Sequence, residues 1–195
     1  MSTPVLTRTA PTDAPILDVL ADRWSTRAYD AETPIDEDAL TSALEAARWA
    51  PSANNSQPWR FVVARRGSAL HAEVLASLIG FNQMWAANAA ALIVAVVENA
   101  TAEGTAISHA QYDLGQAVAH LSVQAHHDGL LVHQMSGFDP EAVRAALDLE
   151  ERFAAFTVLA LGTLGDASVL PEPLQEREQA PRERRALAES IIAND

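Results

Sequence analysis

The chain has 195 residues, and 13 basic against 26 acidic residues give it a formal charge of −13. Every basic residue is an arginine, lysine and cysteine are absent, and 49% of the residues are hydrophobic. This composition fits one domain with a substantial core. It argues against nucleic-acid or anionic-membrane binding, and it excludes disulfides, thiolate nucleophiles and lysine Schiff bases.

The sequence shows no targeting signal. The apolar stretches over residues 89–97 and 153–164 are too short to span a bilayer. The first fifteen residues contain no apolar run of signal-peptide length. We therefore expect a cytoplasmic protein. Residues 1–14, rich in Thr, Pro and Ala, are expected to form a flexible arm before a single domain over residues 15–195.

The first half of the chain favours two helices and then alternating elements. A short helix is expected over residues 16–22. Asp36 is a suitable N-cap for the next helix, and Pro51 ends it. The chain then predicts a strand over residues 60–66, a helix over 68–79 and a strand over 91–98. The last of these is continuously apolar, as in a strand buried on both faces.

The second half begins with the longest predicted helix, over residues 106–128. Gly115 lies inside it, and because glycine costs about 1 kcal/mol there relative to alanine, we expect close packing to require it. Gly129 is the expected C-cap. A strand over residues 130–135, a helix over 140–147, a strand over 156–163 and a polar tail follow. This order of elements is typical of a fold that contains both helices and a sheet.

Three segments carry side chains suited to binding a small anion or a heteroaromatic ring. Arg23-Trp24-Ser25-Thr26-Arg27 places two guanidiniums around a hydroxyl, a pattern that matches phosphate oxygens. The alternative is a solvated helix end. Residues 51–59, PSANNSQPW, follow a helix stop with amides that both donate and accept. The alternative there is a surface turn.

The third segment is Pro181-Arg182-Glu183-Arg184-Arg185, where three of the thirteen arginines lie within four residues. The alternative is a solvated charge run. The acidic neighbours Glu176, Glu178 and Glu183 favour that alternative.

Together these segments resemble the FMN-dependent nitroreductase family, from about Ala14 to Leu187. R-x-S-x-R at 23–27, P-S-x-x-N-x-Q-P-W at 51–59, the stretch 129–139 and the arginines at 182–184 occur in that family's order. The resemblance implies a three-layer α+β fold, in which a central mixed, mostly antiparallel sheet has helices on both faces. It further implies an intertwined homodimer with FMN at the interface. It also implies a C-terminal arm, about 166–195, packed on the partner. Asn54 and Ser136 depart from the pattern, because glycine is common at both positions.

The resemblance also implies roles for individual residues. Arg23, Trp24 and Ser25 would bind the phosphate and ribityl end of FMN, Arg182 and Arg184 would close over the phosphate, and Arg27 would reach the pyrimidine edge. Main-chain groups of Gln134, Met135, Ser136 and Gly137 would face the ring, and the partner would contribute Pro51, Ser52, Ala53, Asn55 and Gln57.

The function implied is an FMN oxidoreductase that takes hydride from NADH or NADPH and reduces nitroaromatics, quinones or related small molecules by a ping-pong scheme. No side chain need act as a nucleophile. Phe81, Met84 and Trp85 are candidates for a substrate pocket, with core packing as the alternative. The histidine spacing predicts no metal site. Alternative functions are a specialised relative (enone reductase, dehalogenase or flavin-consuming enzyme) and a non-catalytic flavin-binding or storage protein.

Overall fold

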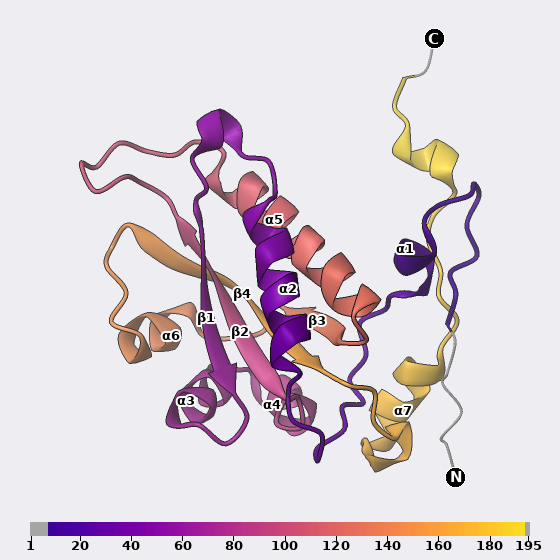
Figure 1. Ribbon diagram of the computed structural model, residues 1–195. Coiled ribbons are helices and arrows are strands. Elements are labelled where there is room, and N and C mark those ends of the chain that lie inside the picture. The colour runs from indigo at the N-terminus through magenta and orange to yellow at the C-terminus, as the bar shows by residue number, and fades with distance from the viewer. Residues whose placement is uncertain (1–7, 194–195) are drawn as a thin grey trace.

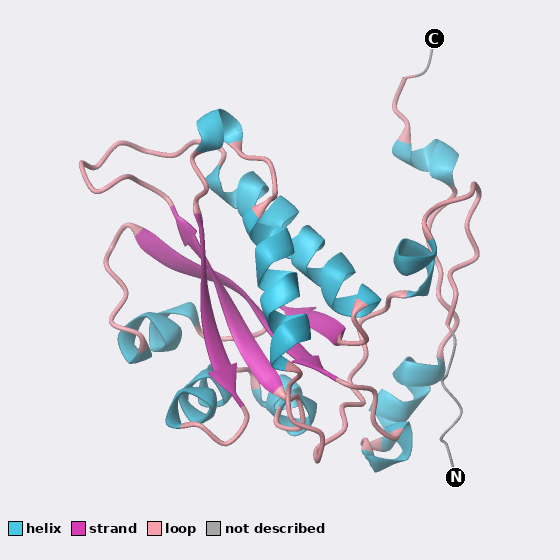
Figure 2. Ribbon diagram, in the orientation of Figure 1, coloured by secondary structure: helices cyan, strands magenta, loops and turns pink. Residues whose placement is uncertain are grey.

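The computed structural model describes residues 8–193 of the chain. Figures 1 and 2 show one sheet with helices on both of its faces. The strands are β1 (Trp59–Arg65), β2 (Ala91–Glu98), β3 (Leu131–Met135) and β4 (Phe153–Gly162). The helices are α1 (Asp18–Asp22), α2 (Glu37–Arg48), α3 (Ala69–Ser77), α4 (Gly80–Ala86), α5 (Ala110–His127), α6 (Pro140–Ala146) and α7 (Glu172–Gln179). Short 3₁₀ turns occupy Ala53–Asn55, Ala167–Val169 and Leu187–Ser190.

The sheet has the order β1-β2-β4-β3, and all three pairings are antiparallel. The α+β prediction is therefore confirmed. The expectation of a mixed sheet was wrong for residues 8–193, because every strand pairing there is antiparallel. β2 is completely buried, as its continuous apolar run predicted. Leu92, Val94 and Val96 belong to the core on one face, and the alternate residues belong to the core on the other.

Each face of the sheet has its own helices. α2 and α5 pack against each other on one face, where Leu40, Leu114 and Leu121 are buried. α3 and α6 pack on the other face. Asp36 caps α2 as predicted, because its side chain accepts from the amides of Asp38 and Ala39. Within the described residues no helix combines the length and apolarity that crossing a bilayer needs.

Two helices were not predicted from the sequence. α4 begins on Gly80 without a side-chain cap, and its polar-punctuated sequence gave no clear period. α7 is a polar helix, EPLQEREQ, with Leu174 and Glu178 buried. Since few of its residues are apolar, only tertiary contacts reveal which side faces the protein.

The two ends of the chain lie side by side (Figure 1, indigo and yellow). The Arg8 guanidinium donates to the carbonyls of Glu178 and Ala180, and the amide of Leu187 donates to the Asp13 carboxylate at 2.9 Å. Residues 8–14 are therefore held against the C-terminal segment instead of forming a free arm. The rest of the expected arm, residues 1–7, lies outside the described residues.

Two glycines provide a test of packing. A Cβ on Gly165 would lie 2.5 Å from the backbone carbonyl of Tyr29, whereas a Cβ on Gly115 meets nothing within 4 Å. Gly115 is thus not required by packing within the chain, contrary to our expectation. We predict that Gly165→Ala lowers the free energy of unfolding by about 1–3 kcal/mol and that Gly115→Ala raises it by about 1 kcal/mol, measured by urea denaturation. A destabilising Gly115→Ala would instead indicate a partner surface on α5.

Candidate functional site

The segment Arg23–Arg27 follows α1 and belongs to no helix or strand, and Arg23 itself has extended backbone angles, with φ −64° and ψ 136°. The Trp24 indole and the Thr26 hydroxyl both donate to Glu178 Oε1, at 3.1 and 2.5 Å. Arg23 instead lines a pocket that neither Trp24 nor Thr26 lines. The Glu178 carboxylate and this pocket therefore engage different side chains of the segment.

A pocket of about 610 Å³ is lined by four arginines: Arg23 at the end of α1, and Arg182, Arg184 and Arg185 in the C-terminal segment. Asp13 and Glu183 also line it. Burial lowers the pKa of Arg23, and the nearby charge of Arg184 lowers it further. Burial also lowers the pKa of Arg182, with contributions from the charges of Arg23, Arg184 and Arg8. Among the described residues none of these guanidiniums has a carboxylate within 4.0 Å. An anion bound here would relieve their mutual repulsion.

Arg182 has a structural role within this group. Its guanidinium donates to the main-chain carbonyls of Arg8, Ala21 and Arg23. It thereby joins the N-terminal segment, the end of α1 and the C-terminal segment. Most of its donors are engaged, so Arg23 and Arg184 are the residues best placed to hold a phosphate, while Arg182 positions them.

Arg27 lies at the other end of the segment with unused hydrogen-bonding capacity. Its Nε is buried without a partner, and its guanidinium carbon lies 5.9 Å from the centre of the Trp85 ring. The Trp85 ring centre is 4.6 Å from that of His133, whose Nδ1 contacts the Thr26 carbonyl at 2.8 Å. The Arg27 guanidinium thus lies against packed aromatic rings, and within the described residues no acceptor binds its Nε–H.

The end of β3 brings the predicted ring-facing segment beside Arg27. Gln134 and Ser136 are exposed, whereas the Met135 side chain is buried. Met135 can therefore contact a ligand only through its main chain, which is the kind of contact that the resemblance implies. The carbonyl of Gly137 accepts from the amide of Ile79 at 2.9 Å and from Asn82 Nδ2 at 3.1 Å. These bonds attach the loop to the start of α4.

The loop at 51–57 has an unusual backbone. Asn54, Asn55 and Gln57 have φ values of 53, 56 and 45°, a left-handed conformation that asparagine tolerates better than most residues. This explains how Asn54 replaces the glycine common at its position. The loop is held by Asp113, whose carboxylate accepts from the Ala53 amide at 3.0 Å.

Within one chain this loop lies far from the arginine cluster. Asp113 is in the first turn of α5, whereas His126 at the other end of α5 is close enough for Arg23 to add to the burial that lowers its pKa. At 1.5 Å per residue, the helix between them spans about 20 Å. Figure 1 shows Ala53–Asn55 at the top of the molecule, away from α1 and α7. The structure therefore separates the predicted cofactor residues into two groups.

The three candidate substrate residues on α4 do not share one environment. Phe81 and Met84 are 41% and 54% exposed, and the Arg177 guanidinium carbon lies 5.5 Å from the centre of the Phe81 ring. Trp85 is completely buried and packs against Tyr29 and His133. Trp85 therefore belongs to the core, the alternative considered for it, because α4 turns this side chain towards the sheet.

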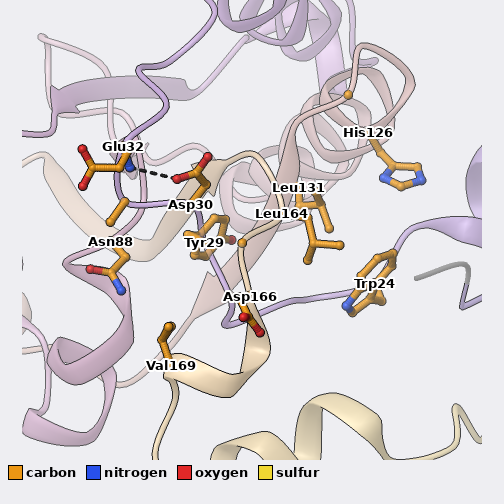
Figure 3. A pocket seen from close by; sticks show the side chains of 13 residues that line it. Trp24, Tyr29, Asp30, Glu32, Asn88, His126, Leu131, Leu164, Asp166 and Val169 are labelled. Carbon is orange, nitrogen blue, oxygen red and sulfur yellow. Dashed lines mark hydrogen bonds between the residues drawn. The ribbon is translucent and has the colours of Figure 1, made fainter. Parts of the chain in front are cut away.

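A second pocket, of about 730 Å³, lies on the Trp24 side of the segment (Figure 3). Its walls include Tyr29, Leu131 and Leu164, and Asp30, Glu32 and Asp166 contribute carboxylates. None of its lining residues is an arginine, whereas the smaller pocket has four arginines against two acidic residues, so the smaller pocket is the better phosphate site. Across the described residues no three His, Asp or Glu side chains gather as metal ligands would.

Sequence reasoning missed the role of Glu178, which it assigned to a solvated charge run. The side chain is only 2% exposed. The available signal was weak: α7 carries several glutamates, and no spacing distinguishes the buried one.

Known proteins show clear similarity to this chain. A model described as the nitroreductase family matches residues 20–83. A crystal structure of an oxidoreductase containing FMN is 34% identical, with a TM-score of 0.90 and 98% of each chain covered. A 5,6-dimethylbenzimidazole synthase of Rhodospirillum rubrum is 32% identical over 71% of this chain and 77% of its own. A major NAD(P)H-flavin oxidoreductase of Aliivibrio fischeri is 35% identical over 35% of this chain and 33% of its own.

His133 makes a testable contribution to acid sensitivity. Burial lowers its pKa to about 4, and the positive charge of Arg27 adds to the shift. The folded chain keeps the ring neutral, while the unfolded chain binds a proton below a pH of about 6.5. Stability is therefore lost as the pH falls from about 6.5 towards 4, by up to about 3 kcal/mol. We predict that His133→Asn reduces this loss in urea denaturation at about pH 7 and pH 5. The exposed control, His127→Asn, should behave like wild type; equal pH dependence in all three proteins would contradict the assignment.

Proposed function

Because the chain belongs to the nitroreductase family, we propose that it binds FMN noncovalently and uses NADH or NADPH to reduce small acceptors such as nitroaromatics or quinones. The observation that carries the proposal is the group of four arginines around one pocket of an acidic protein, none of which has a carboxylate within 4.0 Å among residues 8–193. The names of the FMN-containing structure and of the NAD(P)H-flavin oxidoreductase support the cofactor and the donor.

The residues present fit this cofactor. Arg23 and Arg184 would hold the phosphate by charge-assisted hydrogen bonds. The exposed Ser25 would contact the ribityl chain. Arg27, whose buried Nε has no partner in the described chain, would donate to the pyrimidine edge. The main-chain groups of 134–137 would face the ring.

When bound, FMN supplies the hydride chemistry that no side chain of this protein provides. The protein binds and orients it. The positive charge of Arg27 stabilises the negative charge of the reduced ring. Phe81 and Met84 provide exposed apolar surface beside the 134–137 loop, against which an aromatic substrate can exclude water. A donor and an acceptor that use this same face in turn give a ping-pong reaction.

A homodimer completes the site in this proposal. Pro51, Ser52, Ala53, Asn55 and Gln57 of one chain would join the arginines of the other, because α5 keeps the two groups apart within a chain. Exposed apolar residues occur at α1 and in the C-terminal segment, including Leu17, Leu20, Leu187 and Ile191. Such surface suits burial by a partner, so we assign the arm at about 166–195 to the dimer interface.

The R. rubrum relative is named as a synthase, which favours a specialised activity within the family as the second candidate. Flavin analysis after aerobic turnover separates the two functions. A reductase returns its FMN intact, whereas a flavin-consuming relative loses it.

The first prediction from this proposal concerns colour. The purified protein should be yellow, or become so on addition of FMN, and anaerobic NADH or NADPH should bleach it. A protein that gains no flavin absorbance would overturn the proposal. A yellow protein that neither nicotinamide bleaches would instead be a flavin-binding or storage protein.

The second prediction concerns the phosphate. Arg23→Ala with Arg184→Ala should weaken FMN binding by about 1.5–3 kcal/mol per residue, since each removes a charge-assisted contact. Titration with FMN fluorescence measures the loss. Arg48→Ala is the control, because Arg48 is exposed and pairs with Glu45. Unchanged affinity in the double variant would contradict the phosphate assignment.

Mixing variants tests the shared site. A chain with Asn55→Ala and Gln57→Ala should also bind FMN weakly. When it is refolded together with the Arg23/Arg184 variant, each mixed dimer should regain one intact site and leave the other doubly impaired. No recovery of FMN binding would place the two groups of residues in different sites.

A further inference from the structure

The most buried unexplained charge in the site region is Glu178, in the last turn of α7. Its carboxylate accepts three hydrogen bonds, all from the Arg23–Arg27 segment: the Trp24 indole at 3.1 Å, the Thr26 hydroxyl at 2.5 Å and the Arg27 amide at 3.0 Å. An ionised carboxylate is only an acceptor, and every contact here is a donor. The Glu178 carboxylate is thus bound, among the described residues, by donors of the Arg23–Arg27 segment.

The charge is not neutralised by an ion pair. Among the described residues no guanidinium or imidazole nitrogen lies within 4.0 Å of the carboxylate. Removing a charge from water is costly unless hydrogen bonds compensate it. Both oxygens accept hydrogen bonds here, which a neutral amide with a single acceptor oxygen could not reproduce, so the contacts favour the charged side chain at this buried position.

The field of this charge reaches the residues around the proposed ring site. Burial lowers the pKa of Arg27, and Glu178 opposes that shift. Burial raises the pKa of Tyr29, and Glu178 adds to the effect. Both residues border Trp85, the floor beneath the Arg27 guanidinium.

We propose that Glu178 is a positioning residue that fixes the backbone of Thr26 and Arg27 and places a negative charge behind Arg27, which lowers the reduction potential of the bound flavin. The inference rests on the proposed function. Arg27 alone would stabilise the anionic reduced ring strongly; the buried carboxylate offsets part of that effect. The reduced cofactor then remains a better electron donor.

The experiment compares the two-electron potentials of wild-type, Glu178→Gln and Glu176→Gln holoproteins, measured by dye equilibration. Glu178→Gln keeps the shape of the side chain and removes the charge. Its amide oxygen can still accept from Trp24 and Thr26, whereas the hydrogen bond from the Arg27 amide is lost. It should favour reduced over oxidised FMN by about tenfold, a shift of about +30 mV for two electrons. Glu176→Gln, an exposed neighbour on the same helix, should match wild type.

A second pair of variants tests positioning separately. Thr26→Val removes one donor to Glu178 and the acceptor of the Ala28 amide without changing charge, and it should weaken FMN binding at least about fivefold with the potential unchanged. Thr33→Val is the matched control, because its hydroxyl donates to Asp30 at 2.6 Å, away from Glu178. This pair also carries the test if the Glu178→Gln chain does not fold.

The outcomes are distinct. A yellow wild type with the same potential in Glu178→Gln overturns the charge role. Wild-type FMN affinity in Thr26→Val overturns the positioning role. A wild type that binds no flavin overturns the proposed function, and this inference with it.

Discussion

The arrangement of the candidate site depends on the segment Arg23–Arg27, whose side chains both bind a buried carboxylate and line the phosphate pocket. The side chains of Trp24 and Thr26 bind the buried Glu178 carboxylate, while Arg23 lines the pocket of about 610 Å³ and the Arg27 guanidinium lies near the Trp85 ring. Glu178 lies on α7, so the same contacts attach the C-terminal part of the chain to the segment. Because α7 ends at Gln179, its position then determines where Arg182 lies.

Arg182 completes this connection and explains why arginine suits the chain ends. A planar guanidinium can donate in several directions, and here it serves the carbonyls of Arg8, Ala21 and Arg23 together. A lysine ammonium lacks that fixed fork. The cross-link brings Arg23 and Arg184 close enough to lower the pKa of Arg23 beyond the effect of burial. In a protein of charge −13, repulsion between like positive charges is thus concentrated at one place, where a bound anion would relieve it.

The sequence predicted those elements that local chemistry specifies. The Asp36 cap and the continuous apolar run of β2 depend on neighbouring residues only, and both were confirmed. The core position of Trp85 depends on which way a weakly patterned helix rotates. The burial of Glu178 depends on where a polar helix docks. Such choices between equally polar or equally apolar neighbours are made by tertiary packing, which no local spacing records.

The same reasoning explains why the site residues appear in the sequence as separate, modest motifs. The 51–57 loop is fixed to the first turn of α5 by Asp113, and the arginine cluster lies at that helix's other end. A rigid helix holds the two groups about 20 Å apart, so neither could drift towards the other without unfolding the core. If both groups contact one cofactor, a second copy must supply one of them. The helix that separates them within a chain would then set the spacing of two equivalent sites across the dimer, and the left-handed residues of the loop would be maintained for a contact that the single chain does not make.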